Sequence, residues 1–134
     1  MARNRFTRQR RETGKGAYDV EMRELGFTPG VELVEVGPVA APDEIVKRLQ
    51  LEPGERALIR RRRMYANDEP MQLATSYIPW LLAEGTPMAE RDTGPGGICS
   101  RLADMGHGPV RFTEDVSTRM PTSEEADLLR LTPP

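Results

Sequence analysis

The sequence predicts an α+β fold in which an antiparallel β-sheet is flanked by helices. Residues 57–65 and 70–78 are strand-like segments on either side of the polar turn "ANDE", and this is the pattern of a β-hairpin. Short helical segments with recognisable start or stop signals precede and follow the hairpin. The 134 residues have room for one domain with one core of ordinary size.

The segments before the hairpin alternate between helix and strand patterns. A short helix that begins at Ala17 is expected to end near Gly26, because glycine is a common residue just after a helix. From Val31, "VELVEV" alternates as a half-buried strand does. Residues 41–49, "APDEIVKRL", carry a proline near the start, acids in the first turn and bases in the last, which favours a second helix.

Three more elements are expected after the hairpin. "ICSRLADMG" is predicted to be a helix that ends at Gly106, preceded by the glycine-rich loop "DTGPGG". "VRFTEDVSTRM", residues 110–120, alternates apolar and polar side chains and is predicted to be a strand. "PTSEEADLLRL" is predicted to be a helix capped by Thr122 or Ser123.

Charge is distributed unevenly along the chain. Residues 1–16 form a basic arm or linker, which is either a disordered tail or an arm that docks or lies near DNA. The whole chain has a formal net charge of -2 and a pI near 5.5, which argues against a protein that coats nucleic acid electrostatically.

Membrane, metal and cofactor functions have no support in the sequence. No apolar run approaches the roughly 18 residues that span a bilayer, so we expect a cytoplasmic protein and no membrane partner. Cys99, the single cysteine, is either a small buried filler or a redox thiol. His107, the single histidine, is either a surface loop residue or half of a catalytic pair whose partner the spacing does not supply. No cofactor, metal site or catalytic residue is predicted, because phosphate-loop, dinucleotide and metal-ligand patterns do not occur.

Four consecutive arginines open the hairpin. Strand geometry places Arg60 and Arg62 on one face and Arg61 and Arg63 on the other. An arginine that points inward should meet carboxylates or an anionic ligand, because burying an unpaired guanidinium is costly. The alternative is that all four lie on a wet face or pair with glutamate and aspartate.

Two long motifs carry a family resemblance. The stretch "RRMYANDEPMQLATSYIPW", followed by "GTPMAERDTGPGGICSRLADMGHGPVRFTEDVSTRMPTSEEADLLRL", resembles the effector-binding UTRA domain of GntR-family bacterial transcription regulators, HutC subfamily. The resemblance covers residues 17–134. It implies a chorismate lyase-like fold, no catalytic activity, and a small-molecule effector that changes how an attached winged-helix domain binds DNA.

The same resemblance implies a set of ligand contacts. Arg62 matches a family arginine that helps to hold the anionic group in sugar-phosphate-responsive relatives. Met64 stands where those relatives commonly have a second arginine, and Ala74 stands where a glutamate can touch the sugar. Gly97 and Cys99 replace a hydroxyl residue and a tyrosine, so a different, larger or less polar effector is indicated.

Two further polar side chains are expected near this pocket. Gln72 and Ser76 share a strand face with Ala74 and can form hydrogen bonds, although they are equally readable as solvent-facing strand residues. Glycines before a helix leave its first N–H groups open to an anion. The predicted ligand-binding residues are therefore Arg62, Gln72, Ser76, Gly96, Gly97 and Cys99.

The resemblance is incomplete at both ends. No winged helix-turn-helix precedes residue 17, and the family's last strands do not follow "LLRL", so the chain is either a trimmed regulator or a naturally short form. An unfilled sheet edge favours a homodimer or strand exchange. An effector sensor and a dimerisation or titrating module without a working pocket both remain possible. An enzyme related to the fold's lyase relatives lacks an acid, base or nucleophile cluster.

Overall fold

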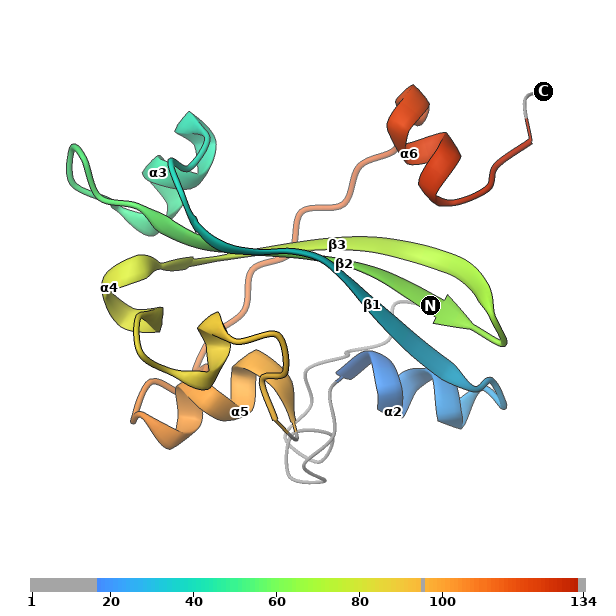
Figure 1. Ribbon diagram of the computed structural model, residues 1–134, viewed down its shortest axis with the longest axis horizontal. Helices are drawn as coiled ribbons and strands as arrows, with labels where there is room; N and C mark the ends of the chain where they lie inside the picture. The colour runs from blue at the N-terminus through green and yellow to red at the C-terminus, as the bar shows by residue number, and fades with distance from the viewer. Residues whose placement is uncertain (1–16, 95, 133–134) are drawn as a thin grey trace.

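The computed structural model describes residues 17–94 and 96–132, which form an α+β domain around one three-stranded antiparallel sheet (Figure 1). The strand order is β1-β2-β3, so β2 is central. The fold class predicted from the sequence is confirmed, and the basic arm predicted over residues 1–16 lies outside the described residues. The strands are β1 (Pro29–Val39), β2 (Ala57–Ala66) and β3 (Glu69–Pro79).

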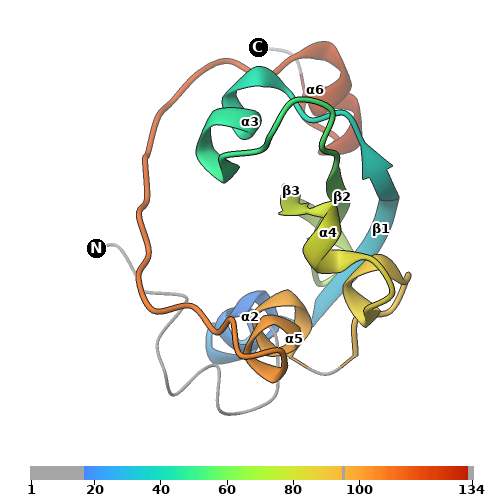
Figure 2. The same cartoon turned by 90° about the vertical axis from the view of Figure 1, so that its left-hand side faces the viewer.

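Short helices lie on both sides of this sheet. Figures 1 and 2 show α2 and α5 on one side and α3 and α6 on the other. None of the described helices is long and apolar enough to cross a membrane. Their bounds are α2 Ala17–Glu24, α3 Asp43–Leu49, α4 Trp80–Ala83, the 3₁₀ helix η1 Pro87–Ala89, α5 Gly97–Asp104 and α6 Ser123–Leu128.

The hairpin of β2 and β3 forms as the sequence predicts. Asn67 and Asp68 form its turn with φ of 49° and 66°, and two consecutive residues with positive φ are the signature of a type I′ turn. The Asn67 side-chain oxygen accepts a hydrogen bond from the Thr28 N–H at 2.8 Å, and the Asn67 N–H donates to the Thr28 carbonyl at 2.9 Å. The turn is therefore tied to the residue that precedes β1.

The hydrophobic core lies at the end of the sheet where β2 begins and β3 ends. Leu58 and Met88 are fully buried, and Ile78 and Ala83 join them in one cluster. Ile98 of α5 packs against this cluster as a partly buried side chain. The core thereby fixes η1 and α5 beside one face of the sheet.

Helix α6 begins at the capping box that the sequence predicts, and Thr122 is its N-cap. The Thr122 hydroxyl accepts a hydrogen bond from the Glu125 N–H at 3.2 Å, and the Glu125 carboxylate accepts one from the Thr122 N–H at 2.8 Å. Arg119 donates two hydrogen bonds of 2.6 Å to the same carboxylate. The Arg119 guanidinium, together with the Thr122 backbone, lowers the pKa of Glu125 to about 2.

The strand predicted over residues 110–120 is wrong. This segment is an extended connection between α5 and α6 that takes no part in the sheet, and Figure 2 shows it running well away from β3. Val110 is 100% exposed and Val116 is 86% exposed. Alternation predicts an extended backbone, but a strand also needs a hydrogen-bonding neighbour, and none lies beside this segment within the described sheet. An ion pair of 3.0 Å between Arg48 of α3 and Asp115 attaches its middle to the domain.

Candidate functional site

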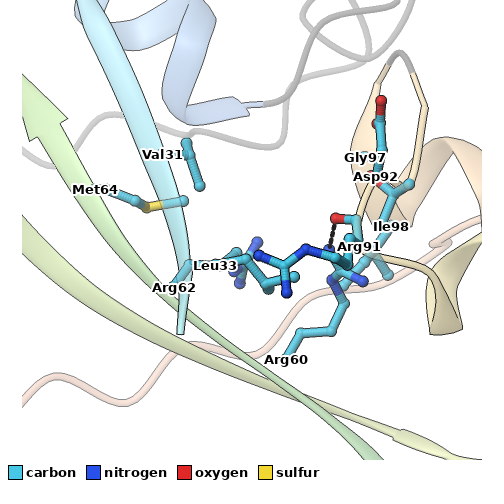
Figure 3. A pocket seen from close by; sticks show the side chains of 10 residues that line it. Val31, Leu33, Arg60, Arg62, Met64, Arg91, Asp92, Gly97 and Ile98 are labelled. Carbon is cyan, nitrogen blue, oxygen red and sulfur yellow. Dashed lines mark hydrogen bonds between the residues drawn. The ribbon is translucent and has the colours of Figure 1, made fainter. Parts of the chain in front are cut away.

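A cavity of about 340 Å³ lies between the sheet and the chain that leads into α5 (Figure 3). This volume is within the range of small-molecule binding pockets. Strands β1 and β2 form one wall, and the loop before α5 forms the other. The lining residues are Val31, Leu33, Arg60, Arg62, Met64, Arg91, Asp92, Thr93, Gly97 and Ile98.

The alternation predicted for the arginine run is confirmed, because Arg61 and Arg63 lie on the sheet face opposite this cavity. Arg61 pairs with Glu35 of β1 at 3.7 Å and with Glu124 of α6 at 3.2 Å. Arg63 pairs with Glu32 at 2.8 Å and donates to the carbonyl of Leu128 at 3.1 Å. On this face the arginines therefore attach α6 to the sheet.

Arg60 reaches inward and donates its hydrogen bonds to backbone carbonyls rather than to a carboxylate. Its side chain is buried, and one terminal nitrogen donates to the carbonyls of Met88, at 2.8 Å, and Glu90. The other terminal nitrogen donates to the carbonyl of Arg91 at 2.9 Å. Burial lowers the pKa of Arg60, and the nearby charge of Arg62 lowers it further. Three backbone carbonyls are thus its hydrogen-bond acceptors, and the nearby Asp92 carboxylate acts on Arg60 only through its charge.

Arg62 lines the cavity two residues further along the same face. Its Nη2 donates to the Ser76 hydroxyl at 2.6 Å, while its buried Nε has no hydrogen-bond partner. Burial lowers the pKa of this guanidinium. In register, Arg62 lies between Leu33 of β1 and Ala74 of β3, which are too apolar to satisfy it. An acceptor from a bound molecule would therefore complete the hydrogen bonding of Arg62.

The Nε of Arg63 is also buried without a hydrogen-bond partner, but Arg63 does not line this cavity. A second cavity of about 430 Å³ lies at the hairpin end of the sheet and is bordered by Thr28, Tyr65, Asp68 and Arg130. None of the residues that border this second cavity has a buried side-chain nitrogen or oxygen without a hydrogen-bond partner.

The predicted ligand-binding residues fall into three groups in the structure. Arg62 and Gly97 line the cavity. Ser76 does not line it, but its hydroxyl accepts a hydrogen bond from Arg62. Gln72 lies on the correct face, opposite Met64, but is not a lining residue. Gly96 and Cys99 are neighbours of lining residues at the start of α5 and do not line the cavity themselves.

The glycine-rich start of α5 offers fewer open amides than the sequence predicts. The Gly97 N–H donates to the Gly94 carbonyl at 3.3 Å, so this amide is already used within the loop. Gly96 is the N-cap in a left-handed conformation, with φ of 86°, which glycine adopts readily. Cys99, expected to be a buried filler or a redox thiol, is only partly buried.

Sequence reasoning missed the wall of the cavity that the loop before α5 supplies. This wall consists of Arg91, Asp92 and Thr93. They match no binding motif, and only their position before a glycine-rich turn could have indicated a role in the site. The Asp92 carboxylate accepts from the Gly94 N–H at 2.8 Å, and Arg101 of α5 donates to the Thr93 carbonyl at 3.2 Å. These contacts hold the loop across from Arg62.

The chain belongs to the UTRA domain family, whose sequence model matches residues 24–134. It is also 33% identical over 101 residues to a Streptomyces coelicolor protein named "Uncharacterized HTH-type transcriptional regulator SCO4628". The matched region is 73% of this chain and 38% of that protein.

Solved structures of GntR-family proteins have the same fold. One GntR-family transcriptional regulator superposes with a TM-score of 0.74 at 26% identity, covering 87% of this chain and 50% of the other. The effector domain of PhnF from Mycobacterium smegmatis has a TM-score of 0.67 at 22% identity, covering 86% and 70% of the two chains. The ligand-binding domain of a GntR-family regulator from Bordetella bronchiseptica has a TM-score of 0.66 at 23% identity, covering 78% and 65%.

These comparisons confirm the UTRA resemblance and the link to GntR-type regulators, while the HutC subfamily stays a prediction. The chain spans about two fifths of the curated relative and half of the first of these structures.

Proposed function

We propose that this chain is the effector-sensing domain of a GntR-type regulator and that the cavity beside Arg62 binds a small organic molecule with an anionic group. The observation that carries this proposal concerns Arg62, which lines the cavity and whose buried Nε has no hydrogen-bond partner. Leaving such a donor unsatisfied costs about 1–3 kcal/mol, and a ligand oxygen would recover that free energy. The similarity in fold to a ligand-binding domain and to an effector domain supports the same conclusion.

The lining residues restrict the chemistry of this ligand. Arg62 supplies a charge-assisted donor for a carboxylate or phosphate oxygen, and Ser76 orients its guanidinium. Val31, Leu33 and Met64 present apolar surface on the sheet side of the cavity. The ligand is therefore an organic anion with an apolar or weakly polar body, in agreement with the loss of polar contacts that the family resemblance implies. Gly97 borders the ligand in this arrangement, and Gln72, Gly96 and Cys99 lie farther from it.

The sensing role also defines the partners that we propose. The effector acts by binding two arrangements of the subunits with different affinities, since only differential binding can transmit a signal. DNA is contacted through an attached winged-helix domain, in a cytoplasmic homodimer. We propose a binding role rather than catalysis, since a curated relative is named a transcriptional regulator and the cavity brings together arginines, one carboxylate and a threonine.

A thermal-shift screen of small carboxylates and phosphate esters tests the sensor proposal. Wild type is compared with Arg62→Met and with Arg61→Met, the matched control whose side chain lies on the opposite face. At least one compound should raise the melting temperature of wild type and Arg61→Met, because a ligand that binds only the folded state stabilises it. The same compound should leave Arg62→Met unchanged. A screen in which no compound stabilises wild type removes the basis of the proposal.

The exposed segment between α5 and α6 favours a second function, dimerisation without a working pocket. Val110 and Val116 are apolar, exposed and spaced for one face of an extended strand. If two copies pair antiparallel about Thr113, Arg111 of each copy lies opposite Asp115 of the other, and Val110 lies opposite Val116. Opposite charges and apolar side chains that face each other across strands are stabilising pairs.

Sedimentation equilibrium tests this pairing of residues 110–116, and the thermal-shift screen tests the ligand pocket separately. Arg111→Asp places two carboxylates opposite each other and should shift the equilibrium toward monomer. The exchanged variant Arg111→Asp/Asp115→Arg restores opposite charges and should restore the dimer. A wild-type chain that stays monomeric at high concentration contradicts the dimerisation function and leaves the ligand test untouched.

A further inference from the structure

Arg60 connects the central strand to the loop on the other side of the cavity. The residue lies on the cavity face of β2, and Figure 3 shows its side chain extending from the strand toward Arg91. Only 4% of its surface is exposed, although arginine is rarely buried to this extent without a charged partner. Its contacts are with the main chain of residues 88–91, which follow it in sequence by about thirty positions.

The three acceptors belong to a segment that lacks a sheet or an α-helix to hold it. Met88 lies in η1 and Glu90 caps its C-terminal end, while Arg91 is in the loop that continues to the cavity. The Met88 side chain is fully buried in the core, so Arg60 holds its carbonyl where the core holds its side chain. A planar guanidinium can donate to several carbonyls at once, whereas a lysine ammonium is a single point charge.

The two inward arginines therefore have different tasks. Arg60 directs both of its terminal nitrogens at carbonyls, and Arg62 keeps a buried Nε available. The two guanidinium groups also repel each other, which contributes to the lowered pKa of Arg60. An anion at Arg62 would reduce this repulsion without needing a hydrogen bond from Arg60.

We propose that Arg60 is the positioning residue of the effector cavity: it fixes residues 88–91, thereby holds Arg91, Asp92 and Thr93 at the cavity wall, and does not itself bind the effector. This inference rests on the proposed function of the cavity. It also restricts the range of ligands that the cavity accepts, because β2 then presents one available guanidinium rather than two. The site accordingly selects molecules with a single anionic group at this position.

Limited trypsin digestion measures how well the loop is held, without any ligand. Arg91 is exposed and precedes Asp92, so the bond between them is a tryptic site inside the segment that Arg60 fixes. The variants are Arg60→Met, Arg60→Lys, and the control Arg61→Met on the opposite face. Fragment masses identify which bonds are cut, and the fluorescence of Trp80, the single tryptophan, monitors global unfolding in parallel.

Trypsin should cut Arg60→Met after Arg91 at least about a hundredfold faster than wild type, the factor expected for losing the three hydrogen bonds that Arg60 donates to this segment. Trypsin should also cut Arg60→Lys faster at this bond, because lysine keeps the positive charge but lacks the planar guanidinium that donates to several carbonyls. Trypsin should cut Arg61→Met after Arg91 at the same rate as wild type. If only the loop opens in these variants, the bonds within β2 should stay intact while the bond after Arg91 is cut.

Two results would overturn the inference. One is an unchanged cleavage rate after Arg91 in both Arg60 variants. The other is faster cleavage that is equal within β2 and after Arg91, which would mean that Arg60 holds the whole fold rather than the loop. If Arg60→Met does not fold, Arg60→Lys carries the test alone. Neither result depends on whether a ligand is found, so failure of the sensor proposal is recognised separately in the thermal-shift screen.

Discussion

Replacing Arg62 with methionine should leave the free energy of unfolding of the unliganded domain nearly unchanged. The variant loses the hydrogen bond from Arg62 to Ser76, a charged donor that contributes about 1.5–3 kcal/mol. It also removes a buried Nε without a partner, which costs the native protein about 1–3 kcal/mol. The two contributions have opposite signs and similar size, so the net change should lie within about 1 kcal/mol of zero.

The same substitution at Arg60 supplies the comparison. Arg60→Met leaves the carbonyls of Met88, Glu90 and Arg91 without their donor in a buried place, at about 1 kcal/mol or more for each acceptor. A loss of at least about 3 kcal/mol is therefore expected from a residue on the same strand face, two positions away.

Urea unfolding of both variants, followed by Trp80 fluorescence, measures these free energies. Unfolding of a single domain of this size is commonly two-state, so the midpoint and slope give the free energy directly. The reasoning is refuted if Arg62→Met is destabilised as strongly as Arg60→Met. Arg62 would then be a structural arginine, and its unpaired Nε would carry no information about a ligand.

Three further predictions concern the helix cap, the core and the hairpin turn. Arg119→Met should raise the pKa of Glu125 from about 2 toward its ordinary value, as followed by carboxyl NMR titration. Because the folded-state pKa lies below the unfolded one, the stabilisation from Glu125 is complete above about pH 4.5 and is lost as pH falls toward 2; the variant should lose less stability over that range. Leu58→Ala should reduce the free energy of unfolding by about 2–5 kcal/mol in urea titrations, because Leu58 is fully buried. Asp68→Gly should raise the melting temperature in calorimetry, with a gain of up to about 1 kcal/mol, since Asp68 has φ of 66° and glycine adopts positive φ without strain.

Each of these predictions has a control within the chain. Leu81→Ala should change stability by less than about 0.5 kcal/mol, since Leu81 is 76% exposed, and an equal loss at Leu58 would contradict the assigned core. Asn67→Gly should destabilise, because it removes the acceptor for the Thr28 N–H. An unchanged Glu125 titration in Arg119→Met would show that the cap alone lowers the pKa.

The elements of this fold were predictable where the signal is local. The hairpin follows from alternation on both sides of a turn whose Asn67 and Asp68 tolerate positive φ, and α6 follows from the Thr122 and Glu125 pair of a capping box. Both signals lie within a few residues of the structure that they specify.

The strand predicted over residues 110–120 shows what local sequence signals cannot predict. Val110, Phe112 and Val116 alternate correctly, but strand formation depends on a neighbour that local sequence does not specify. The segment therefore keeps the extended course without the pairing.

The candidate site was predictable on its β2 side and at Gly97 of α5, but not along the loop between them. Strand alternation placed Arg60 and Arg62 on one face, and the family resemblance singled out Arg62 as a ligand contact. Sequence could not assign Arg60 to the loop, because its acceptors are backbone carbonyls and carry no side-chain signature. For the same reason the wall formed by Arg91 and Asp92 became visible only in three dimensions.

The most direct measurement of the central claim is the NMR signal of the Arg62 Nε–Hε group during titration with a compound that stabilises wild type. A bound anion that accepts from this nitrogen should shift the Arg62 signal strongly and the Arg60 signal only slightly, with amide shifts at residues 91–93 and 97–98. The claim is contradicted if the Arg62 signal stays unchanged while the compound binds, or if the largest shifts fall at Tyr65 and Arg130 beside the second cavity.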